Sequence, residues 1–231
     1  MAQTPDSLTR PLPVRTIAGV TVVDTQIVRD AQQFAQEHST DWVYRHLMRT
    51  WLFGVQIINH NPTLQQGVDL EAHAIATLLH DLGWHQTSTL SFVSNDKRFE
   101  VDGAIAAREF IRNHHDGKLW DEHRVQRVWD AIALHTQPSI AEYKELDVKV
   151  TGNGVLADFA GPIYGVTKSE YDAIVQEFPN EDFLEGVNDT IVWLCKTKPQ
   201  TTVDTWQQRW GEHHVENYPP KGVSFWDLVH R

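Results

Sequence analysis

The chain has 231 residues, of which 41% are hydrophobic and 22% charged, a composition typical of a folded globular protein. This composition excludes collagen-like and disordered chains. The sequence also contains no run of about 18 apolar residues, which is the length that a membrane-spanning helix needs. The 31 acidic residues outnumber the 20 basic ones, and the net charge of −11 disfavours contact with the phosphates of nucleic acid. We expect one domain, a cytoplasmic location, and no nucleic-acid or membrane partner.

The chain is predicted to have a helical core between two extensions. Residues 1–28 are expected to form an extended arm, because Pro11 and Pro13 disfavour a helix there. This arm contains no apolar run typical of a signal peptide. The helical core is predicted over residues 29–198. Residues 199–231 are expected to be an extension that packs on the core or on a partner subunit.

Apolar residues recur every three or four positions through the core, which predicts α-helices. No alternation is long enough to predict a sheet. We interpret Gly152 and Gly154 as a turn that enters a helix ending at 161, after a mixed connection over 138–151. The predicted helices cover residues 30–37, 42–60, 69–83, 101–115, a stretch from 121 onward, 154–161, 168–178 and 181–195. The predicted fold class is all-α.

The sequence offers little for covalent catalysis. Cys195 is the only cysteine and lies in an apolar helical run, where we expect it to pack rather than react. There is no G-x-S-x-G elbow, no phosphate-binding glycine loop and no H-E-x-x-H motif. The adjacent pairs His114-His115 and His213-His214 point to different faces of a helix, so we interpret them as surface residues.

His80 and Asp81 end an apolar helix in the segment A-T-L-L-H-D-L-G. An unpaired carboxylate is costly to bury there, whereas a divalent cation would satisfy both residues. His46 lies on the preceding predicted helix and Asp158 on a later one, so only a helical bundle could bring the four together. The residue types suit Zn²⁺ and also Fe²⁺, Mn²⁺ or Ni²⁺.

The order H…HD…D resembles the HD-domain superfamily of metal-dependent hydrolases, and the closer similarity is to its cyanamide hydratase-like branch. The similar segments are R-H-L-M-R-T-W-L-F-G at 45–54, A-T-L-L-H-D-L-G at 76–83, R-F-E-V-D-G-A at 98–104, A-I-A-L-H-T-Q-P-S-I at 131–140 and V-L-A-D-F-A-G at 155–161. The resemblance implies an HD-domain helical bundle. It places the metal ligands on His46, His80, Asp81 and Asp158.

One position departs from the pattern of the superfamily. Members that hold two metals have a histidine where this chain has Phe99, while the neighbouring Glu100 is retained. We therefore expect one divalent ion, with Zn²⁺ as the first choice, and no two-iron oxygenase chemistry. His135, in the segment A-L-H-T, resembles a histidine of the branch that faces the site. It is expected either to bind the metal or to handle a proton.

The branch adds water to the nitrile of cyanamide and forms urea, so the resemblance implies a detoxifying lyase that uses a metal-activated water. His135 is the expected proton donor to the nitrile nitrogen. Glu100 is expected to orient the water or a ligand, and Thr136 to donate a hydrogen bond to the substrate amine. The pocket for this small neutral substrate is expected to be lined by Trp51, Phe53, Trp84, Phe92 and Phe159.

Two other functions stay open from the sequence. An HD-family phosphohydrolase, acting on a nucleotide or a small phosphate monoester, would need cations near the metal, and Arg45, Arg49 and Arg98 could supply them. A non-enzymatic scaffold or small-molecule sensor would keep the fold, although retention of all four ligand residues argues against it. The Trp-rich tail leads us to expect a homo-oligomer.

Overall fold

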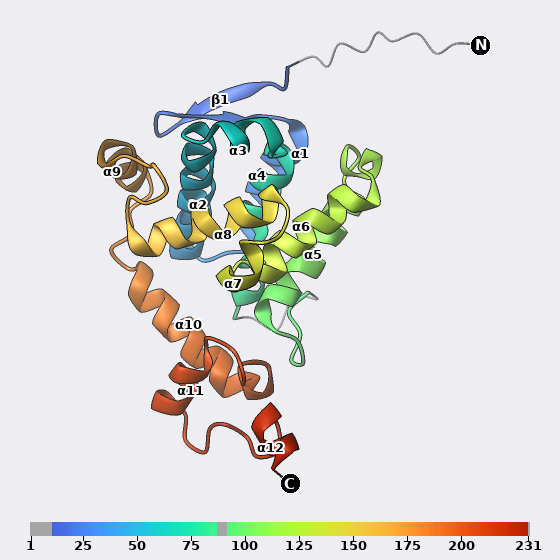
Figure 1. Ribbon diagram of the computed structural model, residues 1–231, viewed down its shortest axis with the longest axis vertical. Helices are drawn as coiled ribbons and strands as arrows, with labels where there is room; N and C mark the ends of the chain where they lie inside the picture. Colours follow the sequence, from blue (N-terminus) through green and yellow to red (C-terminus); the bar gives the residue numbers. More distant parts are fainter. Residues whose placement is uncertain (1–10, 87–91, 231) are drawn as a thin grey trace, which may run out of the picture.

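The structure, a computed structural model, describes residues 11–86 and 92–230. Within these residues the chain is mostly helical, which confirms the all-α class apart from one two-stranded sheet (Figure 1). No helix in this part of the chain is both long and apolar enough to cross a membrane. The strands and α-helices are β1 (Val14–Ile17), β2 (Val20–Val23), α1 (Gln26–Glu37), α2 (Asp41–Asn59), α3 (Pro62–Gly67), α4 (Leu70–Leu79), α5 (Phe99–Asn113), α6 (Glu122–Leu134), α7 (Pro138–Ala141), α8 (Leu146–Ala160), α9 (Lys168–Glu177), α10 (Phe183–Thr197), α11 (Gln208–His214) and α12 (Phe225–Val229).

The N-terminal segment forms an antiparallel hairpin of β1 and β2 at one end of the helical body (Figure 1). Its two-residue turn is Ala18-Gly19, and both residues have a positive φ, of 48° and 79°. Val20, Val22 and Val23 are buried in the core. The expectation of no sheet is therefore wrong here. Four-residue strands are too short for alternation to stand out, and the turn carries the better signal.

The core is built around the crossing of α2 and α8, with α4 and α6 packed beside them (Figure 1). A Cβ atom added to Gly154 of α8 would lie 2.7 Å from the carbonyl oxygen of Thr50 and 3.3 Å from the backbone of Gly54, both on α2. Only glycine at this position lets the two backbones approach so closely. The crossing therefore brings side chains of α2 and α8 into direct contact.

The close approach explains an error in the sequence-based assignment of α8. The helix begins at Leu146 and runs without interruption through Gly152 and Gly154. The interpretation of these glycines as a turn, after a connection over 138–151, is therefore wrong. The glycine at 154 is required by the neighbouring helix and not by a turn.

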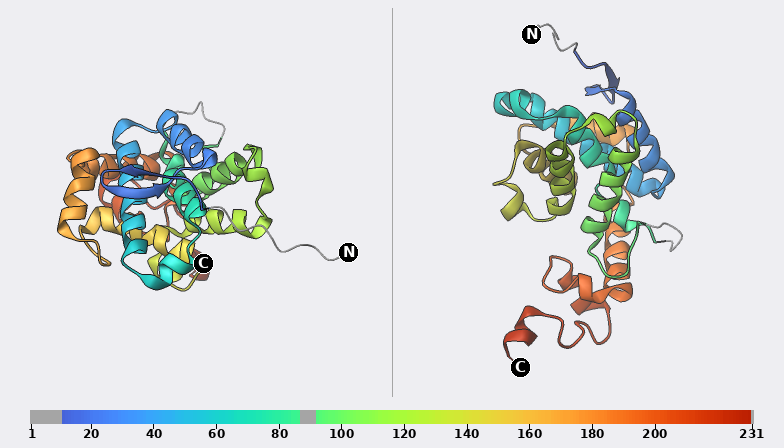
Figure 2. Two further views of the ribbon diagram at one scale, coloured as in Figure 1. Left: turned by 90° about the horizontal axis from the view of Figure 1, so that it is seen from above. Right: turned by 90° about the vertical axis from the view of Figure 1, so that its right-hand side faces the viewer.

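The C-terminal part, from α10 to α12, extends from one end of the body (Figures 1 and 2). A buried ion pair anchors it, because Nζ of Lys198 lies 2.8 Å from Oδ2 of Asp102 on α5 and 3.2 Å from the carbonyl oxygen of Ser94. Trp206 and Trp210 then pack against the core. The part of the chain predicted as an extension therefore contributes side chains to the body.

Candidate metal centre

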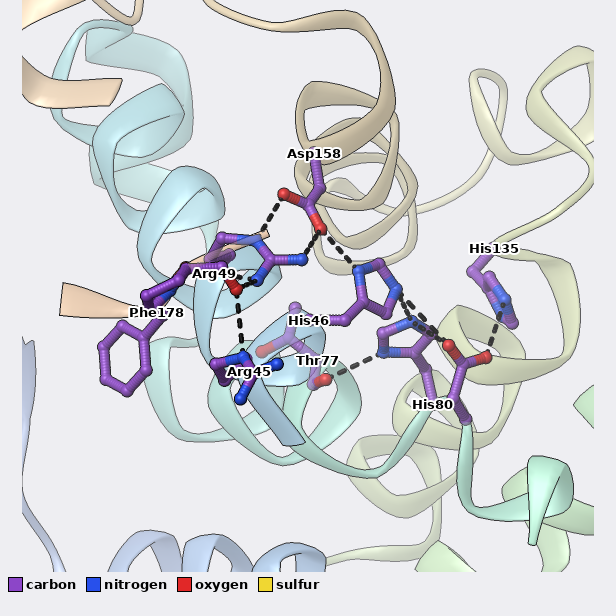
Figure 3. A network of polar contacts seen from close by, with 10 residues as sticks. Arg45, His46, Arg49, Thr77, His80, His135, Asp158 and Phe178 are labelled. Atoms are coloured by element: carbon purple, nitrogen blue, oxygen red, sulfur yellow. Dashed lines mark hydrogen bonds and ion pairs between the residues drawn. The ribbon is translucent and has the colours of Figure 1, made fainter. Parts of the chain in front are cut away.

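Three of the predicted ligand residues meet in the core (Figure 3). His46 comes from α2, while His80 and Asp81 follow the last residue of α4, and each is at most 2% exposed. Nε2 of His46 lies 3.2 Å from Nε2 of His80 and 3.3 Å from Oδ2 of Asp81. Nε2 of His80 lies 3.1 Å from the same oxygen. This buried group could hold a metal ion.

The hydrogen atoms of the two rings lie on the side away from this group. Nδ1 of His46 is 2.7 Å from Oδ2 of Asp158, and Nδ1 of His80 is 2.8 Å from the carbonyl oxygen of Thr77. Because these oxygens can only accept, each Nδ1 carries the hydrogen. A neutral ring then has only a lone pair on Nε2. The two Nε2 atoms and the carboxylate of Asp81 therefore present acceptors to one another.

Such an arrangement requires a cation. Both carboxylate oxygens of Asp81 are buried and have no hydrogen-bond donor, which is costly for an ionised group. Two ligand atoms at about 2.0–2.1 Å from a shared tetrahedral Zn²⁺ would lie about 3.3 Å apart. The three separations of 3.1–3.3 Å agree with that spacing. The residues present therefore fit a divalent cation.

The electrostatics of the group also favour positive charge. Burial raises the pKa of Asp81, but His80 and His46 outweigh burial and the pKa is lowered overall. Burial lowers the pKa of His46, whereas the carboxylates of Asp158 and Asp81 raise it by more. The buried carboxylates therefore stabilise a cation at this place, either a proton on His46 or a metal ion.

His135, directly after α6, faces the same group (Figure 3). Its Nε2 lies 3.6 Å from Oδ1 of Asp81, and its Nδ1 lies 2.7 Å from the carbonyl oxygen of Ile132. Burial lowers the pKa of His135 to about 4, and the charge of His80 adds to this effect. A ring that is neutral at pH 7 can bind a metal or accept a proton at Nε2. Donation of a proton, as expected from the sequence, requires an earlier proton uptake.

Asp158 contacts the side of the His46 ring that faces away from His80 (Figure 3). Its Oδ1 accepts a hydrogen bond from Nε of Arg49 at 2.7 Å, and its Oδ2 accepts one from Nη2 of Arg49 at 2.8 Å. Arg49 is fully buried and also donates to the carbonyl oxygens of Phe178 and Pro179. Carboxylates in this position orient a ligand histidine and its tautomer. In the structure Asp158 contacts the ring of His46, whereas the sequence analysis predicts Asp158 as a fourth metal ligand.

Glu100 and Thr136 support the segment next to His135. The fully buried carboxylate of Glu100 accepts hydrogen bonds from Nη2 of Arg98 at 2.5 Å and from Oγ1 of Thr136 at 2.6 Å. This bond uses the hydroxyl hydrogen of Thr136, and the expected hydrogen bond from Thr136 to a substrate amine stays a prediction. The buried ring of Phe99 packs edge-on against His135, with centroids 5.7 Å apart.

A cavity of about 420 Å³ lies next to this group. Its polar lining residues are His46, Asp81, His135 and Thr136. Its apolar lining comes mainly from α8 and from the C-terminal part of the chain, and includes Trp84, Val155, Leu156, Phe159, Trp206 and Trp210. A molecule in this cavity would contact the candidate metal ligands at one end and apolar side chains elsewhere.

The predicted aromatic lining agrees with this cavity only in part. Trp84 and Phe159 line it. Trp51 and Phe53 are instead fully buried in the core, where the ring of Phe53 stacks on another aromatic ring. Phe92 lines a separate cavity beside α1 and α5. Aromatic composition alone does not separate core residues from pocket residues.

Sequence reasoning missed the roles of Arg49, Trp206 and Trp210. Arg49 follows His46 by three residues, which places both on one face of α2. That spacing predicts that the side chains of His46 and Arg49 can contact the same carboxylate. The two tryptophans are four residues apart in a tail predicted to pack on the core, but nothing local indicates which part of the core they reach.

Comparison with known proteins does not assign a family, because no family model and no curated protein matches the chain. The fold and the site together define a mostly helical protein with a buried histidine–aspartate group that could hold a metal ion. An apolar cavity reaches this group.

Proposed function

We propose that the protein is a metal-dependent hydratase of the HD-domain superfamily, in its cyanamide hydratase-like branch, and that it converts cyanamide to urea. The observation that carries the proposal is the convergence of His46, His80 and Asp81 as acceptors around one place beside a cavity. When bound, a divalent cation, Zn²⁺ as the first choice, supplies a Lewis acid that lowers the pKa of water to about 7.

The residues of the chain have separate roles in this proposal. His46, His80 and Asp81 would hold the ion, while Asp158, oriented by Arg49, holds the ring of His46. Addition of water forms a C–O bond at the nitrile carbon and leaves the nitrogen needing a proton. Neutral His135 accepts a proton from water at Nε2 and can return it to that nitrogen.

A second cavity also borders the candidate metal centre. This cavity, of about 430 Å³, is also lined by Asp81 and Trp84, so the two cavities share these two residues. Its lining includes the polar residues His38, Thr40 and Asp189, whereas most of the side chains that line the first cavity are apolar. In this proposal, water enters through the second cavity while the organic substrate occupies the first.

The positions of the arginines weigh against the phosphohydrolase alternative. Arg49 is paired with Asp158, and Arg45 and Arg98 each make ion pairs with carboxylates outside the group. Among the described residues that line the first cavity there is no lysine or arginine. A phosphate would therefore lack the cationic partner that such sites usually provide.

The test combines metal analysis with an assay for urea. We expect the purified chain to hold one ion, to form urea from cyanamide, and to lose and regain this activity when the ion is chelated and restored. His115→Ala, at an exposed histidine on the surface, is the matched control and should behave as the wild type. No urea from fully metal-loaded protein would disprove the proposal, and phosphate release from a nucleotide panel would favour the alternative.

A further inference from the structure

The cavity beside the candidate metal centre is far larger than cyanamide. Its volume is about 420 Å³, whereas one water molecule takes up about 30 Å³ in the liquid. Cyanamide has three heavy atoms and would leave most of this space to water. Cavities of several hundred Å³ with a few polar groups are typical of sites for larger organic ligands.

The apolar side chains of the cavity are suited to a hydrocarbon group. Leu156 and Phe159 of α8 are 40% and 43% exposed, although both are large and apolar. Trp206 and Trp210 of the C-terminal part line the same cavity. A ligand that covers these side chains removes apolar surface from water, which stabilises the complex.

The two C-terminal tryptophans form one wall of the cavity and contact each other. Nε1 of Trp210 donates to Oδ1 of Asn188 at 3.2 Å, and the ring of Trp206 packs edge-on against Trp210 with centroids 5.6 Å apart.

We propose that this site acts on cyanamides that carry a bulky neutral hydrocarbon group, which lies against Trp206 and Trp210 while the nitrile reaches the candidate metal ligands. The proposal rests on the proposed function and narrows its substrate class to substituted cyanamides. One water adds to R–NH–C≡N and gives R–NH–CO–NH₂. The carbon–oxygen double bond forms while the C≡N triple bond becomes a single bond, both O–H bonds of water break and their protons go to the nitrogen, and no oxidant or reductant is used.

A pair of substrates with the same reacting group tests the proposal. For the metal-loaded wild type, we expect kcat/KM for benzylcyanamide to exceed that for cyanamide by at least about tenfold. Trp210→Ala should reduce this ratio about tenfold, and Leu156→Trp, which narrows the cavity from an exposed position, should reduce it as well. Trp226→Ala is the matched control, because Trp226 lies in the same part of the chain, is 68% exposed and does not line the cavity.

Equal kcat/KM values for the two nitriles, or an unchanged ratio in both Trp210→Ala and Leu156→Trp, would overturn the proposal. A binding measurement separates it from the hydratase assignment. By calorimetry, the product benzylurea should bind the wild type at least about tenfold more tightly than Trp210→Ala. If benzylurea binds in this way but no nitrile is hydrated, the proposed function is wrong, and the cavity is a binding site for neutral ligands with a hydrocarbon group. If cyanamide is hydrated and benzylurea does not bind, only the substrate class is wrong.

Discussion

Two groups of two histidines and one aspartate occur in the described part of the chain. The buried group consists of His46, His80 and Asp81, and the surface group consists of residues 114–116. Residue types and proximity are the same in both. The buried group brings together two chain segments, α2 and the two residues that follow α4, whereas the surface group is one continuous stretch after α5.

The two groups differ in where the ring hydrogens lie. In the surface group, Nδ1 of His114 accepts a hydrogen bond from the backbone N–H of Asp116 at 3.1 Å, so its Nε2 carries the hydrogen and donates to Asp30 at 2.9 Å. His115, whose side chain is 75% exposed, pairs with Asp116. Every ring nitrogen of His114 is therefore used. Only the buried group leaves lone pairs directed at one another, which is the property that favours a cation between them.

The largest effect is expected on removing a ligand of the buried group. His80→Ala should lower metal content from one ion per chain to less than about one tenth and reduce urea formation by about 1000-fold, equivalent to about 4 kcal/mol. Mass spectrometry of the metal and a urea assay provide the two measurements. Full metal occupancy in this variant would show that the ion lies elsewhere.

The second largest effect is expected at His73, a buried histidine whose pKa is shifted by burial and not by a neighbouring carboxylate. His73 is fully buried, and burial lowers its pKa from 6.5 to about 4 despite a contact with the backbone of Trp51. Between these values the unfolded chain binds the proton and the folded chain does not. The contribution of His73 to the free energy of unfolding should therefore be fully present above pH 6.5. It should fall by about 3 kcal/mol as the pH drops to about 4.

Urea unfolding of metal-free wild type and His73→Gln at pH 7 and pH 4 measures this contribution. The variant should lose about 3 kcal/mol less than the wild type over that interval. Metal-free protein is used so that protonation of the metal ligands does not add a second pH dependence through metal release. The same pH dependence in both proteins would contradict the assignment to His73.

The partner of His46 should have a smaller effect than a ligand. Asp158→Asn keeps the shape of the side chain but removes the charge that orients His46 and pairs with Arg49. Metal affinity should fall by about 10- to 100-fold, as is typical when the partner of a ligand histidine is changed. Competition with a chelator measures the affinity, with circular dichroism to verify folding. A loss as complete as in His80→Ala would indicate that Asp158 itself binds the ion.

Much of the fold and the centre of the site could be predicted from the sequence, because they depend on local pattern. The three- and four-residue spacing of apolar residues places His46 within α2, and the leucines before His80 place the H-D pair at the end of α4. The carboxylate after those leucines indicates a buried charge that needs a partner. These inferences use neighbours in sequence, which stay neighbours in the fold.

The parts that could not be predicted depend on contacts between distant segments. Gly154 is a helix residue because the backbone of α2 passes next to it, and no local rule distinguishes this from a turn. The orientation of Asp158 depends on Arg49, which lies 109 residues away. Trp206 and Trp210 line the cavity, whereas Trp51 does not, because the path of the C-terminal part decides which aromatics reach it.

The smallest effect is expected at the surface group, where a substitution tests whether residues 114–116 hold a metal ion. His114→Ala removes one ion pair with Asp30, whose side chain is 38% exposed, and the packing of a ring that is 9% exposed, so the change in unfolding free energy should stay within about 2 kcal/mol. Metal content and urea formation should match the wild type, because no free lone pair is lost. A fall in metal content by half or more would show that residues 114–116 also hold an ion, and that burial and ring-hydrogen placement are not what separates the two groups.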